Sequence, residues 1–266
     1  MERSDPLESA LRNDRIIVLA ALAGIATVAW GYMLFEARAM QQTGVCECFG
    51  LAMSGPDTQP WAVAAIFPLF LMWVEMMVAM MIPSAAPMIL TFARVNRQRR
   101  EMERPFVPSS LFLLGYLVVW GGFSLAAAFA QWALHGTALL SPMMTSSSPV
   151  LGGVLLICAG AFQWTPWKRA CLNHCRSPLS FLLDGWREGR MGAFVMGLQH
   201  GAYCTGCCWL LMVLLFVAGV MNMLWVAVIT LLVLLEKILP HATRFGTVVG
   251  VVFVAWGAWM IAARWF

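Results

Sequence analysis

Residues 191–217 read MGAFVMGLQHGAYCTGCCWLLMVLLFV and contain no Asp, Glu, Lys or Arg. A helix needs about 20 apolar residues to cross a hydrocarbon core about 30 Å thick, and this stretch is long enough. Similar apolar runs recur at about 16–36, 62–92, 109–134, 149–166, 220–238 and 245–264. We therefore predict an all-α fold, a polytopic bundle of seven transmembrane helices that forms a single integral membrane domain over residues 1–266.

The composition supports this fold and excludes several classes of function. Of the 266 residues, 61% are apolar and only 11% are charged, whereas soluble domains have roughly a quarter charged residues. The net charge of +4 does not indicate a nucleic-acid partner, because the basic residues lie in short clusters between the apolar runs. The sequence has no Walker motif and no dinucleotide fingerprint. We expect the lipid bilayer as the surroundings, no nucleic acid, and no ATP-driven pumping by this chain alone.

The distribution of basic residues predicts the orientation. All but two of the 17 lysines and arginines lie in the N-terminal tail or in the loops after the second, fourth and sixth predicted helices. The exceptions are Arg38 and Arg264. Because cytoplasmic loops carry an excess of Lys and Arg, the N-terminus is predicted to be cytoplasmic and the C-terminus to lie outside.

The apolar run 191–217 also carries four soft donors: His200, Cys204, Cys207 and Cys208. At 100° per residue they fall within an arc of about 100° on one face of a helix. Copper(I), zinc or an iron–sulfur cluster accepts such donors. A single membrane cysteine is usually packing, but three in five residues, one turn after an imidazole, favour a metal or redox role.

The predicted helix 62–92 offers partners for these donors. Met72, Met76 and Met80 repeat at every fourth position, and thioethers select copper(I) over zinc. Methionine also fills gaps in apolar cores, so the stripe by itself has a packing explanation. Glu75 favours a functional role for this helix, because placing a carboxylate deep in a membrane span costs free energy. Its candidate partners are His200, a metal ion or a proton.

Two further cysteine groups lie in predicted loops. If the connector after the fourth helix is helical, Cys171 and Cys175 stack at i and i+4 with His174 beside them, and flanking basic residues favour thiolate. The alternative is a basic amphipathic connector with incidental thiols. Cys46 and Cys48, in the first external loop, predict a disulfide, a metal clip or a redox-active pair.

Three features bear on how the predicted helices pack. Gly197 and Gly201 form a small-xxx-small face that favours close approach of a neighbouring helix to the thiols. Pro83 leaves a backbone carbonyl one turn earlier without its helical donor. Glu236 and Lys237 are adjacent and therefore do not face each other, so we expect them to snorkel to the interface.

The chain is similar over about residues 70–240 to a bacterial family of predicted metal-binding integral membrane proteins. The residues that carry the resemblance are Met80–Ser84, Phe162–Pro166, Lys168, Cys171, Cys175, Arg176, Pro178, Gly197, His200, Gly201, Tyr203, Cys204, Gly206–Trp209, Met212, Gly219, Met221, Asn222, Glu236 and Lys237. The resemblance implies metal binding in the bacterial inner membrane.

These observations favour a metal-binding membrane protein that handles copper(I), by transfer or by metalloprotein assembly, with a protein partner in the membrane or periplasm. Zinc or another soft metal would suit the same donors. One alternative is a membrane thiol–disulfide oxidoreductase, in which Cys207 and Cys208 form a vicinal disulfide or exchange with Cys46 and Cys48. Another is a structural subunit of a larger membrane complex, which short loops and the lack of a soluble domain would suit.

Overall fold

A computed structural model describes residues 6–43, 46–48, 51–53, 63–101, 107–136, 148–220 and 222–263. Within these ranges the chain is almost entirely helical. The helices are α1 (Pro6–Thr43), α2 (Ile66–Glu101), α3 (Ser109–Gly136), α4 (Pro149–Phe162), α5 (Pro166–Arg176), α6 (Pro178–Asp184), α7 (Gly189–Val213), α8 (Leu215–Ala218), α9 (Met223–Ile238) and α10 (Ala242–Ala262), with a 3-10 turn η1 at Val63–Ala65. The short strands β1 (Cys46–Cys48) and β2 (Leu51–Met53) pair antiparallel after α1.

Five helical segments among the described residues are long and apolar enough to cross a membrane: 16–39, 63–99, 109–135, 189–218 and 242–262. The pair α4 and α5 is bent by 65° at its break and makes a sixth if it counts as one span. The predicted fourth span does not continue to residue 166, because α4 ends at Phe162 after 14 residues, about 21 Å. The all-helical class is confirmed, whereas the count of seven and the orientation of the termini remain predictions.

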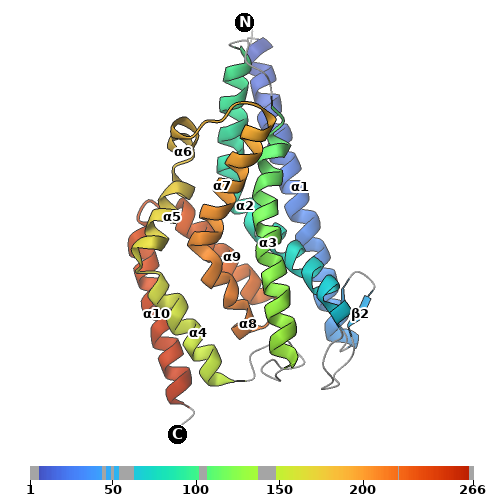
Figure 1. The fold of residues 1–266 in the computed structure, drawn as a ribbon, viewed down its shortest axis with the longest axis vertical. Coiled ribbons are helices and arrows are strands. Elements are labelled where there is room, and N and C mark those ends of the chain that lie inside the picture. Colours follow the sequence, from blue (N-terminus) through green and yellow to red (C-terminus); the bar gives the residue numbers. More distant parts are fainter. Residues whose placement is uncertain are drawn as a thin grey trace, which may run out of the picture.

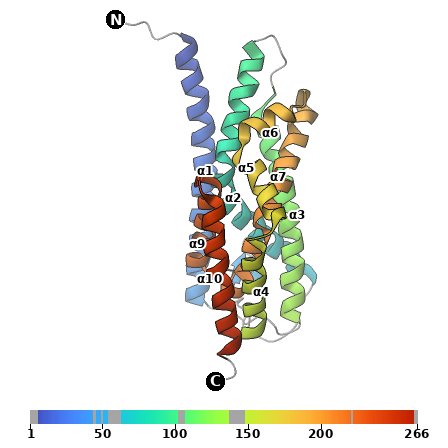
Figure 2. The same cartoon turned by 90° about the vertical axis from the view of Figure 1, so that its left-hand side faces the viewer.

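The helices form two unequal groups (Figures 1 and 2). Helices α1, α2, α3 and α7 run along the long axis of the molecule, with α2 packed between α1 and α3, and α3 against α7. Helices α4 and α10 form a second close pair beside them, at the end where the C-terminus lies. Helix α5 continues from α4 and packs against α7.

Glycines set both of the closest helix crossings. A side chain on Gly197 would meet the carbonyl of Phe112 on α3, and one on Gly115 would meet the carbonyl of Phe194 on α7. The predicted close approach at Gly197 is therefore confirmed, and α3 is the neighbour. The α4–α10 pair uses glycines from both helices in the same way.

The proline in α2 is compensated by a neighbouring helix. Because Pro83 has no N–H, the carbonyl of Ala79 lacks its helical donor. Trp30 of α1 donates its indole N–H to the Ala79 oxygen at 3.1 Å. The predicted orphan carbonyl is thus satisfied, and this bond ties α1 to α2.

Candidate metal centre

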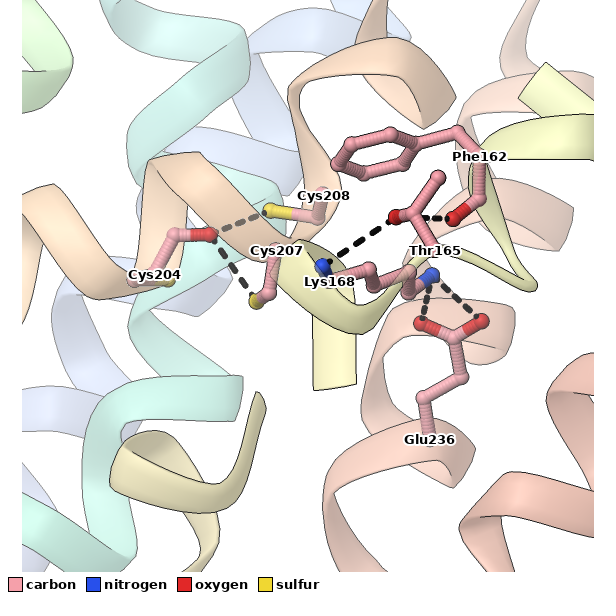
Figure 3. A network of polar contacts seen from close by, with 7 residues as sticks. All are labelled: Phe162, Thr165, Lys168, Cys204, Cys207, Cys208 and Glu236. Atoms are coloured by element: carbon pink, nitrogen blue, oxygen red, sulfur yellow. Dashed lines mark hydrogen bonds and ion pairs between the residues drawn. The ribbon is translucent and has the colours of Figure 1, made fainter. Parts of the chain in front are cut away.

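Three buried thiols line the middle of α7 on the face predicted from their spacing. Cys204, Cys207 and Cys208 are each at most 1% exposed, and none is in a disulfide. The thiols of Cys207 and Cys208 donate to the Cys204 carbonyl at 3.0 and 2.9 Å (Figure 3). This bonding to a carbonyl one turn earlier satisfies two S–H groups that would otherwise be unpaired in the interior.

Helix α5 brings further thiols to this face. Its start is encoded locally, because Thr165 caps the backbone N–H of Lys168 at 3.2 Å and Pro166 occupies the first turn. The buried side of α5 carries Cys175, whose thiol lies close to those of Cys204 and Cys207. It also carries Cys171, whose sulfur lies against Gly206 of α7. We refer to Cys171, Cys175, Cys204, Cys207 and Cys208 as the thiol cluster.

His174 does not join the thiol cluster. Its ring is exposed and stacks on Tyr203 with the ring centroids 4.2 Å apart, while Nδ1 lies 2.9 Å from the Ala170 carbonyl oxygen. The connector is helical as expected, but the His174 ring is exposed and lies on Tyr203 of α7, whereas the two cysteines are buried. The role of His174 as a metal ligand beside them remains a prediction.

A cation and a phenol converge on Cys204. The Lys237 ammonium lies 3.1 Å from the Cys204 sulfur and 2.8 Å from the Ser84 hydroxyl, and the Tyr116 hydroxyl lies 3.2 Å from the same sulfur. An ammonium group only donates hydrogen bonds, so the Cys204 sulfur is the acceptor. The expectation that Lys237 snorkels was wrong, because α9 directs it into the bundle.

Glu236 also turns inward, toward a different partner. Lys168 of α5 donates to both carboxylate oxygens of Glu236 at 2.8 and 2.7 Å (Figure 3). The two side chains are only 3% and 2% exposed. The predicted snorkelling of Glu236 was therefore wrong as well. This buried ion pair fastens α5, and with it Cys171 and Cys175, to α9.

His200 lies one helical turn before Cys204 and has unused nitrogens. It is 2% exposed, and neither Nδ1 nor Nε2 has a hydrogen-bond partner among the described residues. Its ring stacks with Tyr116 at 5.4 Å and with Phe112 at 6.0 Å, between centroids. A buried polar atom without a partner is costly, so His200 retains donor capacity that a ligand at this site would use.

The methionines of α2 are core residues. Met72, Met76 and Met80 are all buried, in the same hydrophobic core that contains the cysteines of α7. Glu75 is partly exposed, its Oε1 has no described partner, and it lies near the Glu36 carboxylate of α1. Of its three candidate partners, His200 does not pair with Glu75, because neither imidazole nitrogen has a hydrogen-bond partner among the described residues.

The prediction for Cys46 and Cys48 concerns side chains that lie outside the described part of the structure. Their backbone forms β1, in which Cys46 is paired with Met53 and Cys48 with Leu51. This ribbon packs against α1 and α2, away from α5 and α7. It therefore belongs to a different region of the molecule from the thiol cluster.

No set of three or more His, Cys, Asp and Glu side chains among the described residues is arranged to hold a metal ion. The hydrogen bonds give the physical reason, because the Cys207 and Cys208 thiols point at a carbonyl and aromatic rings surround His200. The structure brings Cys175 to the α7 thiols but does not preassemble a ligand set. Sequence reasoning missed Tyr116, Ser84 and Lys237, although a Glu-Lys pair inside an apolar run was a signal for the last.

One comparison with known proteins gives a match. A family model described as PpoB2, copper chaperone, matches residues 70–260. This range contains most of α2, all of α3 to α9 and most of α10, including all of the thiol cluster, but not α1 or the β ribbon. No curated protein and no solved structure matches significantly. The match agrees with the metal-binding membrane family that the sequence resembles.

Proposed function

The chain belongs to the copper chaperone family PpoB2, and from this premise we propose that it carries copper(I) on its thiol cluster. The ion is cargo, received by the protein and passed to a partner in the membrane or periplasm. The observation that carries this proposal is the meeting of thiols from two separate helices, α5 and α7, in the protein interior. Thiolates are the soft ligands that copper(I) prefers.

The hydrogen bonds suit an ion that must be released. Copper binding removes the thiol protons, so Cys207 and Cys208 give up their bonds to the Cys204 carbonyl when they become ligands. When the ion leaves, the same carbonyl is again available as their acceptor. The carrier therefore has two satisfied arrangements, and the unpartnered His200 is a candidate additional ligand next to Cys204.

Lys237 supplies the countercharge that such an ion requires. A copper(I) ion held by two thiolates carries one net negative charge, and a buried charge is stable only with a partner. The Lys237 ammonium already lies 3.1 Å from Cys204. With copper bound through Cys204 and one neighbouring thiolate, the buried site becomes electrically neutral.

We propose that the protein is a polytopic protein of the bacterial inner membrane. The seven-segment topology with a cytoplasmic N-terminus, taken from the basic residues, places α5 on the cytoplasmic side. Copper would be received there at Cys171 and Cys175. The onward route for copper would be formed by Met72, Met76 and Met80 with Glu75. The outermost copper site would be formed by Cys46 and Cys48.

The test is metal analysis of the full chain purified in mild detergent. We expect about one or more copper ions per chain, and loss of copper from the double variant Cys204→Ser/Cys207→Ser. Cys158→Ser is the matched control, because Cys158 is a free, exposed cysteine on α4 outside the thiol cluster. Wild-type protein without stoichiometric metal, or a double variant that retains it, would refute the proposal. Stoichiometric zinc instead would keep the site and change the cargo.

A membrane thiol–disulfide oxidoreductase is the second candidate, favoured by the proximity of the Cys175 thiol to those of Cys204 and Cys207. One disulfide there would join α5 to α7. A free-thiol count separates the two functions. Thiols that become reactive after chelation of copper support the carrier. Thiols that become reactive only after reduction, in metal-free protein, support the oxidoreductase.

A further inference from the structure

A polar cavity of about 120 Å³ is lined in part by the Lys168–Glu236 ion pair. It opens between the α4–α5 turn and the first turns of α10. Its polar lining consists of Gln163, Lys168, Arg169, Glu236, Thr243 and Thr247. The volume suits several water molecules or the five heavy atoms of a phosphate group. Nothing in the copper function uses this cavity.

Gln163 indicates that the cavity takes a ligand. The side chain is only 6% exposed, yet neither its amide oxygen nor its amide nitrogen has a hydrogen-bond partner among the described residues. It lies close to the Glu236 carboxylate without meeting hydrogen-bond geometry. Leaving the amide nitrogen without an acceptor is unfavourable, and a ligand with acceptor atoms would satisfy it.

The charges around Gln163 favour an anion. Glu236 is neutralised by two hydrogen bonds from Lys168, so the Arg169 guanidinium is the uncompensated charge in the lining. Arg169 donates one N–H to the Trp164 carbonyl at 2.7 Å and is otherwise exposed. The N-terminus of α10 also faces the cavity through Thr243, and His241 at the N-cap provides no side-chain hydrogen bond to it. Helix N-termini attract anions.

The position of the cavity identifies the source of the anion. Helix α10 is a candidate membrane span that begins at Ala242, and as a span it would have its first turn at a membrane surface. Trp164, which lines the cavity, is 39% exposed, and Trp167, three residues further along the chain, is 71% exposed, as expected of aromatic residues at the headgroup level. By the distribution of basic residues this surface is the cytoplasmic one, where anionic phospholipids attract Arg and Lys.

We propose that this cavity binds the phosphate group of a membrane phospholipid. The phosphate oxygens accept from Gln163, Arg169 and the first turn of α10, while the acyl chains extend along the apolar surface of α4 and α10. A bound lipid would then brace the base of α5, the helix that holds Cys171 and Cys175. This binding does not depend on the copper function.

The test measures lipid binding by the full chain in detergent, by native mass spectrometry and by the shift in thermal unfolding. The probes are phosphatidylglycerol, phosphatidylcholine and inorganic phosphate. The main variant is Gln163→Leu, which leaves the net charge and hence the general attraction to anionic surfaces unchanged. A second variant is Thr247→Val, matched by Thr230→Val, because both threonines bond to the carbonyl four residues earlier but only Thr247 lines the cavity.

We expect phosphatidylglycerol to raise the unfolding temperature of the wild type, and Gln163→Leu to weaken that binding by about tenfold, the effect of losing a hydrogen bond to a charged group. Thr247→Val should weaken it less, and Thr230→Val should not change it. Copper content should stay the same in all of them. Equal lipid binding by wild type and Gln163→Leu would overturn the proposal, as would inorganic phosphate binding as tightly as the lipid, which would make a soluble phosphate the occupant.

Discussion

Breaking the Lys168–Glu236 ion pair by Glu236→Gln should strongly destabilise the protein. Both side chains are almost fully buried, and both carboxylate oxygens accept from the same ammonium group. The variant leaves the Lys168 charge in the interior without a partner, which costs roughly 3–5 kcal/mol. At roughly 2–4 °C per kcal/mol, the unfolding temperature should fall by about 6–20 °C.

The assay is thermal unfolding in detergent followed by circular dichroism, combined with the rate at which a maleimide labels Cys171 and Cys175. Loss of the ion pair frees α5 from α9, so both thiols should label faster. The matched control is Glu188→Gln. Its partner Arg99 and Glu188 itself are partly exposed, and such pairs contribute about 0–1 kcal/mol.

A double variant separates charge from packing. Lys168→Met/Glu236→Met removes both charges and fills a similar volume, so it should recover most of the lost stability, because apolar replacements of buried ion pairs are often neutral. The reasoning is refuted if Glu236→Gln melts no lower than Glu188→Gln, or if the double variant is less stable than Glu236→Gln.

Three further predictions follow from the packing. Gly197→Ala should lower the free energy of unfolding by about 1–3 kcal/mol, because the added side chain forces α3 away from α7. Gly121→Ala, where a side chain meets open space, should leave thermal stability unchanged or raise it. Equal effects of the two variants would contradict a close α3–α7 contact at Gly197. Trp30→Phe should lower the free energy of unfolding by about 1 kcal/mol, because its hydrogen bond to the Ala79 carbonyl of α2 is lost. The loss should be smaller in a Pro83→Ala background, where α2 supplies its own donor to that carbonyl. Additive effects in this double-mutant cycle would show that the Trp30 bond does not compensate for Pro83. Lys237→Met should slow alkylation of the thiol cluster, because the ammonium favours thiolate at the sulfur it contacts. Lys237→Arg should restore much of the rate. An unchanged alkylation rate in Lys237→Met would show that Lys237 is not the countercharge of the proposed copper site.

Local signals account for the parts of the fold that were predicted. The helical spacing placed Cys204, Cys207 and Cys208 on one buried face, and the structure has them there. Gly197 predicted a close helix neighbour, and α3 is that neighbour. The break after Phe162 was also encoded, since Thr165 and Pro166 are an N-cap and a first-turn proline, but the predicted span was continued across them.

The predictions that failed depended on which neighbour a side chain meets. Snorkelling was expected for Glu236 and Lys237 because long polar side chains at a helix end usually reach the interface. In the structure Glu236 accepts a hydrogen bond from Lys168. Lys237 donates to Ser84 and Cys204. A buried partner satisfies each charge, so the interface is not needed.

The sequence by itself determined the helical class, the apolar segments and the angular position of each donor on its own helix, because hydrophobicity and the 3.6-residue period act within one segment. The tertiary structure alone decided that Cys175 meets Cys204 and Cys207, that Lys237 contacts Cys204, and that Lys168 pairs with Glu236. Ion pairs and thiol contacts between different helices depend on helix crossings and on the 65° bend between α4 and α5. Those arise from packing between segments far apart in the chain, and no single helix encodes them.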